Sequence, residues 1–128
     1  MRYLIDSSAL IDWLKGRPPA VSLFADLVQG GHTLAVNAIA VAEVYSGLGP
    51  DERDATDRLV SDLDYWDIDP GTAALAGAYR YQFARQGRTL SLPDVIMAAH
   101  AVRNGATLVT GSVRDFPMLD VAIHRLEH

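Results

Sequence analysis

Four acidic residues lie far apart in this sequence, at places where an α/β fold would bring them together: Asp6, Glu43, Asp94 and Asp115. Carboxylates held in apolar surroundings repel one another and lose hydration. A protein that gathers them therefore usually places a divalent cation between them. Such a centre suits hydrolysis of phosphodiester bonds by metal-activated water. The pattern predicts a metal-dependent enzyme that cuts nucleic acid.

Taken singly, these acids have ordinary explanations. Asp6 follows a short apolar segment and could simply cap the next helix. Asp94 lies in a predicted first helical turn, where the helix dipole favours a negative charge. Asp115 could end a turn. Glu43 is harder to explain, because its neighbours are mostly apolar and leave it little polar helix face. The prediction of a site rests on all four occurring together.

Composition limits the kind of site that the chain can hold. The 128 residues predict a single domain, residues 1–128, with 49% hydrophobic and 21% charged residues, as in a packed globular protein. Cysteine is absent, which excludes disulfides, thiolate metal sites and a cysteine nucleophile. Oxygen ligands remain, and they favour Mg²⁺ or Mn²⁺. The net charge of −5 argues mildly against a nucleic-acid partner, although bound metal ions would neutralise part of it.

No apolar run approaches the ~20 residues that a membrane-spanning helix requires. The first residues, Met1 to Asp6, form too short an apolar stretch for a secretory signal. We therefore expect no membrane association and a cytoplasmic location.

Hydrophobic periodicity and turn residues predict alternating strands and helices. The expected strands are residues 3–5, 33–36, 66–68, 106–109 and 121–123, and the expected helices are residues 8–14, 20–28, 38–48, 51–63, 70–86 and 92–104. This alternation predicts an α/β fold with a mostly parallel sheet covered on both faces. Ligands of such sheets bind beyond the carboxyl ends of the strands. We therefore expect Asp6 and the segment 110–115 to meet at one edge.

Four segments, in order, carry a resemblance that spans essentially the whole chain: residues 3–10, Ala42-Glu43, residues 90–94 and residues 108–116. Together they resemble PIN-domain ribonucleases, and within that family the VapC-type toxins of bacterial toxin–antitoxin pairs. The resemblance implies a three-layer α/β/α domain with a mostly parallel central sheet. It also implies an endoribonuclease that hydrolyses RNA with metal-activated water.

The resemblance assigns roles to individual residues. Asp6 and Asp94, helped by Glu43 and Asp115, would hold one or two Mg²⁺ ions, with Mn²⁺ as a substitute. Ser7 and Thr110 would orient the carboxylates or water. Family members commonly carry Asn or Asp two residues after this threonine, where the chain has Ser112. Serine is a poor metal ligand, so Ser112 would instead bond a water or phosphate, and the fourth acidic role falls to Asp115.

The resemblance also implies partners. A VapC-like toxin is restrained by a VapB-type antitoxin protein whose tail covers the acidic pocket, and such toxins usually form homodimers. The apolar stretch from Val41 to Leu48 could supply part of a dimer interface, although burial in the core explains it equally well.

Other interpretations of the same residues remain. A phosphoaspartate domain would also place an Asp after its first strand, but it needs a late lysine or a second nearby Asp, and Lys15 and Ser8 supply neither. A stronger alternative is a PIN-like domain that binds RNA or a partner without cutting, which Ser112 favours. The four histidines do not form a metal set, and His100 is expected to be partly buried with its hydrogen bonds satisfied. Trp13 and Trp66 are expected to be core or interface residues, and Arg114 either contacts phosphate or lies on a solvated face.

Overall fold

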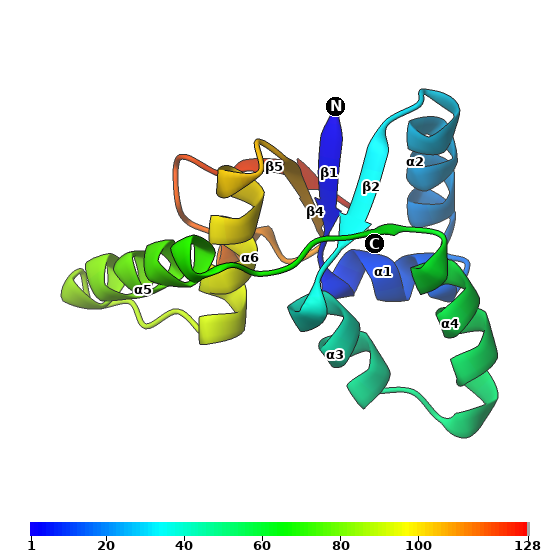
Figure 1. The fold of residues 1–128 in the computed structure, drawn as a ribbon, viewed down its shortest axis with the longest axis horizontal. Coiled ribbons are helices and arrows are strands. Elements are labelled where there is room, and N and C mark those ends of the chain that lie inside the picture. Colours follow the sequence, from blue (N-terminus) through cyan, green and yellow to red (C-terminus); the bar gives the residue numbers. More distant parts are fainter. Residues whose placement is uncertain (128) are drawn as a thin grey trace.

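Short runs of apolar residues form the centre of the molecule, which the computed structural model describes for residues 1–127. The strands are β1 (Arg2–Ile5), β2 (Thr33–Val36), β3 (Asp64–Tyr65), β4 (Thr107–Thr110) and β5 (Ala122–Arg125). They form one sheet in the order β3-β2-β1-β4-β5, and every pairing is parallel. β1 is therefore the central strand, as Figure 1 shows. The predicted α/β class and parallel sheet are confirmed.

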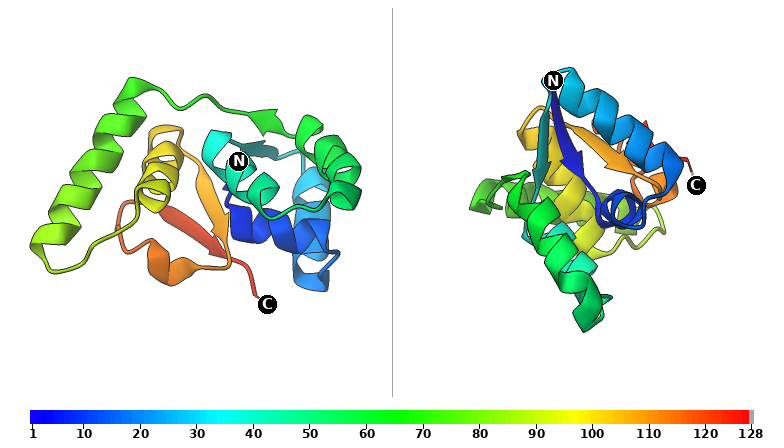
Figure 2. Two further views of the ribbon diagram at one scale, coloured as in Figure 1. Left: turned by 90° about the horizontal axis from the view of Figure 1, so that it is seen from below. Right: turned by 90° about the vertical axis from the view of Figure 1, so that its right-hand side faces the viewer.

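Parallel strands need crossover connections, and helices supply them on both faces of the sheet. The α-helices are α1 (Ser7–Leu14), α2 (Pro18–Gln29), α3 (Ala38–Ser46), α4 (Arg53–Ser61), α5 (Pro70–Arg85) and α6 (Leu92–Arg103), and the short 3₁₀ helices are η1 (Pro50–Glu52) and η2 (Val113–Asp115). Figure 2 shows α2 and α6 on opposite sides of the strands. The predicted three-layer α/β/α arrangement is confirmed.

The hydrophobic core consists of two buried clusters, because side chains alternate between the two faces of the sheet along each strand. Leu4 of β1 belongs to a buried cluster with residues of α5 and α6, including Ala76 and Met97. Its neighbour Ile5 belongs to a second cluster, on the α1 and α2 face, with Leu10 and Phe24. Successive side chains of a strand point to opposite faces, so β1 contributes to both clusters.

None of the helices within residues 1–127 is long and apolar enough to cross a membrane.

The strand expected at residues 66–68 is wrong. The structure places β3 two residues earlier, at Asp64–Tyr65, and only the Trp66 amide still bonds the sheet, by donating to the Val36 carbonyl at 2.9 Å. Beyond it, the Asp67 carbonyl accepts a hydrogen bond from the His100 ring at 3.2 Å, and the Asp69 side chain caps α5 through the Thr72 amide at 2.8 Å. These bonds turn the backbone away from the sheet.

Other boundaries differ by a few residues. β4 and β5 each begin one residue later than expected, α3 ends at Ser46, and the helix expected over residues 51–63 is divided into η1 and α4. α2 begins at Pro18, two residues earlier than expected. Pro18 and Pro19 occupy its first turn, where a missing backbone N–H costs nothing.

Candidate active site

The candidate site lies where the direction in which successive strands are added to the sheet reverses. From β1 the chain moves outward to β2 and β3, then returns to the other side of β1 as β4. The carboxyl ends of β1 and β4 flank this switch point, where α/β sheets bind ligands. Asp6 directly follows β1, and Thr110 is the last residue of β4. In Figure 1, β1 and β2 point down toward α1 and α3, which begin at this edge.

Asp6 is 6% exposed and is held by hydroxyl groups. The Thr110 hydroxyl donates to Asp6 Oδ2 at 2.7 Å, and the Ser8 hydroxyl lies 3.2 Å from the same oxygen. The hydroxyls are in turn fixed by the backbone of the following loop. The Gly111 amide donates to Ser8 Oγ, and the Ser112 amide donates to Thr110 Oγ1, both at 3.0 Å. The orientation of Asp6 is therefore set before any ligand binds.

The other three acids come from separate elements. Asp94 is partly buried in the first turn of α6, where its amide donates to the Ser91 hydroxyl at 3.2 Å. Asp115 is partly buried at the end of η2, and Glu43 is an exposed residue of α3. The expectation that its apolar neighbours leave Glu43 little polar helix face is wrong. Its neighbour Ala42 is exposed as well, so α3 does present a solvated face at this point.

Electrostatic interactions join the four carboxylates. Burial raises the pKa of Asp6, and the negative charge of Asp115 adds to the rise. Burial also raises the pKa of Asp94, to which Asp115 and Asp6 contribute. Although the residue is exposed, partial loss of hydration at its carboxyl raises the pKa of Glu43, and the charges of Asp6 and Asp94 add to the rise. Elements separated by most of the chain thus bring Asp6, Asp94 and Asp115 into repulsion with one another, and Glu43 into repulsion with Asp6 and Asp94.

The polar residues expected beside the acids lie where they can support them. The Ser7 side chain bonds Glu43, which partly offsets the rise in its pKa. Thr110 and the Ser112 backbone belong to the network around Asp6. Ser8 has a role that the sequence analysis missed. Its position, two residues after Asp6 in the first turn of a helix, was the available signal, because such hydroxyls point back toward the helix start.

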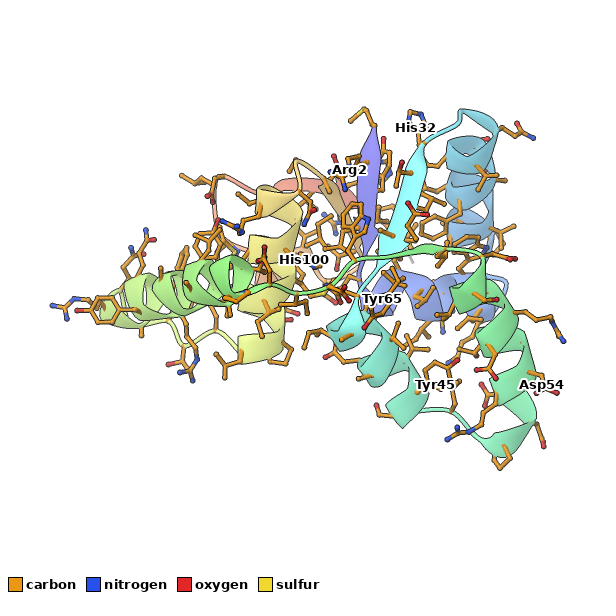
Figure 3. The ribbon with its side chains drawn as sticks, in the orientation of Figure 1. Arg2, His32, Tyr45, Asp54, Tyr65 and His100 are labelled. Atoms are coloured by element: carbon orange, nitrogen blue, oxygen red, sulfur yellow. The ribbon has the colours of Figure 1, made fainter. Side chains whose placement is uncertain are left out.

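A buried bridge fixes α3 relative to α6. Asn37 caps α3 by accepting a hydrogen bond from the Ala40 amide at 3.0 Å, while its amide nitrogen lies 2.8 Å from His100 Nδ1 on α6. His100 Nδ1 therefore accepts, and the protonated Nε2 donates to the Asp67 carbonyl. Figure 3 shows His100 on α6 beside the segment that leads to α5. The bridge joins the helices that carry Glu43 and Asp94.

One histidine, two tryptophans and one arginine were also singled out in the sequence, and the structure places each of them. His100 is 1% exposed with both ring nitrogens bonded, and burial lowers its pKa, as expected for a neutral structural histidine. Trp13 stacks on Phe24 at 4.3 Å between ring centroids, and Trp66 packs against the core. Arg114 is exposed.

The chemistry of this donor set fits a hard divalent cation, since it consists of carboxylate oxygens whose repulsion a cation would relieve. Within residues 1–127, however, no three His, Asp or Glu side chains are already arranged as a metal site. The donors are of the right chemical kind, and the elements that carry them meet at one edge of the sheet.

Comparison with known proteins agrees with this architecture. The sequence pattern of the PIN-domain family matches residues 3–116. Ribonuclease VapC19 of Mycobacterium tuberculosis is 29% identical over 115 residues, which cover 90% of this chain and 92% of the relative. VapC ribonuclease Mb1587 of Mycobacterium bovis is 32% identical over 111 residues, 83% of each chain.

Among solved structures, that of VapBC2 from Rickettsia felis bound to a DNA fragment from its promoter has the same fold, with a TM-score of 0.87. The match covers 99% of this chain and 100% of the other at 20% identity. The matching family pattern, the similar ribonucleases and the acidic switch point at β1 and β4 agree: this chain belongs to the PIN-domain family, as a VapC-type ribonuclease.

Proposed function

We propose that this chain is the toxin of a toxin–antitoxin pair and that it hydrolyses RNA phosphodiester bonds with the help of a divalent metal ion. The observation that carries the proposal is the electrostatic repulsion that links Asp6, Glu43, Asp94 and Asp115 at the switch point of the sheet. Ribonucleases of this family generally depend on a divalent metal. Since the donors are oxygens, we propose Mg²⁺, with Mn²⁺ as a substitute.

Asp6 and Asp94 would hold the ion, and Glu43 and Asp115 would complete its surroundings. Ser8 and Thr110 orient Asp6, and Ser7 restrains Glu43. When bound, a divalent ion supplies an activated water near neutral pH and neutralises charge on the phosphate. The carboxylates would also orient that water, so no protein nucleophile is required. Ser112, in the loop after β4, would bond a water or a phosphate oxygen.

The biological setting is part of the same proposal. The protein would act on cytoplasmic RNA as a single domain of residues 1–128, and a VapB-type antitoxin would cover the acidic edge.

A homodimer is the expected assembly. The stretch 41–48 is a weaker candidate for the dimer interface than the sequence suggested, because Val44 is 2% exposed and Val41 and Leu48 pack against the core.

A PIN-like domain that binds RNA without cutting it is the second candidate function. Two observations favour it: Ser112 stands where family members commonly have Asn or Asp, and the acidic side chains within residues 1–127 are not arranged as a ready metal site. This alternative predicts RNA binding with no cleavage in any divalent metal.

Cleavage of RNA by the purified chain separates the two functions. We expect products with Mg²⁺ or Mn²⁺ and none with EDTA. Asp6→Asn and Asp94→Asn should each remove activity, because each replaces a charged ligand by a neutral amide of the same shape. The matched control is Asp54→Asn, an exposed aspartate on α4 that Figure 3 labels. Cleavage that survives EDTA would contradict the metal mechanism, and binding without cleavage would favour the alternative.

The toxin role is tested in cells. The chain is expressed alone and together with the neighbouring open reading frame, and the RNA ends that appear are mapped. We expect growth arrest that the neighbour relieves and that Asp6→Asn abolishes. Harmless expression with no new RNA ends would contradict the toxin role.

A further inference from the structure

An RNA chain that reaches the four carboxylates faces an electrostatic barrier. The protein carries a net charge of −5, and each nucleotide of RNA adds a negative charge. A metal ion can neutralise the phosphate that is cut, but the neighbouring phosphates must also lie close to the same acidic edge. Positive side chains beside that edge would lower this barrier. Arginine is well suited, because its planar fork matches two phosphate oxygens.

A hollow of about 520 Å³ lies directly beside the acidic edge. The loop after β4 and one residue of β5 line it: Gly111, Ser112, Val113, Arg114, Asp115 and Arg125. We call it the arginine hollow. It shares Asp115 with the acidic cluster, and Arg125 lies opposite Thr110 in the register of β4 and β5. Thr110 also donates a hydrogen bond to Asp6, the most buried acid of the site. Thr110, at the end of β4, therefore lies between Asp6 and the Arg125 position of the hollow.

The two arginines of the hollow are available to a ligand. Arg114 is exposed, and its guanidinium has no hydrogen bond or ion pair within residues 1–127. Among the described residues 1–127, the Arg125 guanidinium has a single 3.5 Å contact, with Glu127, in which both side chains are largely exposed. Such pairs contribute little, so a phosphate could replace the carboxylate at low cost. Arg88 donates to the Arg114 carbonyl and thereby fixes the backbone of the loop.

We propose that the arginine hollow binds a phosphate of the RNA backbone next to the phosphodiester that is cut, with Arg114 and Arg125 as the positive contacts and Ser112 as a hydroxyl donor. The proposal rests on the RNA-cutting function above and adds a substrate subsite to it. A carboxylate of a protein partner could use the same arginines. RNA is the better occupant, because a chain with a phosphate at every nucleotide must place one beside the cluster when its neighbour is cut.

Binding of a short, fluorescently labelled single-stranded RNA of mixed sequence tests the proposal. The full chain is titrated with Ca²⁺ in place of Mg²⁺, and a gel confirms that the RNA stays intact. We expect Arg114→Gln and Arg125→Gln each to raise Kd roughly 3- to 10-fold. Each should also reduce the slope of log K against log salt by about 0.7, the value for one lost phosphate contact on a single strand.

Arg58→Gln is the matched control. Arg58 is an exposed arginine on α4, which leads into β3 at the opposite edge of the sheet from β5. It should leave Kd and the salt slope unchanged, and thermal melting should show that all three variants remain folded. Arg125→Lys should keep the salt slope but recover only part of the affinity, because lysine keeps the charge and loses the fork.

The outcomes separate this proposal from the cleavage function. If the wild type cuts RNA while both arginine variants bind like the wild type, the subsite is wrong and the nuclease stands. If the variants bind RNA normally but lose affinity for the protein encoded beside the toxin, the hollow belongs to that partner and the proposal fails. If the wild type binds RNA through the two arginines but cuts nothing, the subsite stands and the nuclease fails.

Discussion

At the scale of single residues, Asp6 combines two opposing requirements. Its burial favours a neutral carboxyl group, whereas metal binding requires a carboxylate. The hydroxyls of Thr110 and Ser8 act against the effect of burial, since their hydrogen bonds lower the pKa that burial raises. These small side chains therefore keep a buried carboxyl group usable, and their removal should affect both stability and activity.

Thr110→Val tests this role, because valine keeps the shape of threonine and removes only the hydroxyl. We expect a loss of about 1–3 kcal/mol in the free energy of unfolding at neutral pH, since a buried carboxylate loses its shortest hydrogen bond. Cleavage or metal affinity should fall roughly 10- to 100-fold. Urea unfolding and RNA cleavage measure the two effects.

The control is Thr107→Val, a partly exposed residue of the same strand. It should change neither quantity by more than a small amount. The destabilisation by Thr110→Val should shrink as the pH falls to the ordinary aspartate pKa of 3.8, because the pKa of Asp6 is raised and its carboxyl has already taken up a proton there. A penalty equal at both pH values would show that valine acts through packing alone.

At the scale of elements, the site depends on how helices are joined. Glu43 and Asp94 lie on α3 and α6, whose relative position is fixed by the Asn37–His100 hydrogen bond. Asn37 performs two tasks at once, since its oxygen caps α3 and its nitrogen reaches α6. It is completely buried, so an unpaired partner there would be costly.

Variants of Asn37 separate these tasks. Asn37→Ala should lower the free energy of unfolding by about 2–3 kcal/mol, the sum of a lost cap and a lost buried hydrogen bond. Asn37→Ser keeps a capping oxygen but cannot reach His100, so it should recover about 1 kcal/mol. Urea unfolding gives the stability of both. Equal stability of Ala and Ser variants would mean that the cap contributes nothing.

At the scale of the whole molecule, the acidic edge lowers the stability of the metal-free protein. The pKa values of Asp6, Asp94 and Glu43 are raised in the folded state. A raised carboxyl pKa gives stability that is complete below the unfolded pKa and is lost as the pH rises through the folded pKa. For these three groups the loss begins above their ordinary values of 3.8 to 4.5 and continues as the pH rises through the raised pKa values of the folded state.

Saturating Mg²⁺ should therefore raise the melting temperature at neutral pH, because the ion binds only the folded state. Without metal, Asp94→Asn should melt a few degrees above the wild type, since it removes one repelling charge. The loss of a favourable charge at the start of α6 opposes this gain, but the raised pKa of Asp94 shows that repulsion and burial dominate. Scanning calorimetry with EDTA and with Mg²⁺ measures both effects.

Two results would contradict this account of the acidic edge. An unchanged wild-type melting temperature in Mg²⁺ would mean that no site forms in the folded protein. A gain from Mg²⁺ in Asp94→Asn equal to that of the wild type would show that the ion binds without Asp94.

The sequence by itself determined the features that local periodicity encodes. Alternating apolar runs and turn residues predicted the parallel α/β layers, and the acids at a strand end and in a first helical turn predicted a site at the carboxyl edge. Asp6 and Thr110, 104 positions apart, could be expected to meet because adjacent parallel strands end at the same edge. Each of these inferences needs only nearby residues and a general rule of sheets.

Tertiary structure alone decided the contacts that no local pattern records. The two-residue strand β3 ends where it does because Asp67 and Asp69 bond to α6 and α5. The bridge from Asn37 to His100 and the position of Arg125 beside Thr110 both depend on residues from separate elements. Such contacts follow from the packing of the complete fold, because hydrogen bonds between distant residues leave no periodic signal in the sequence.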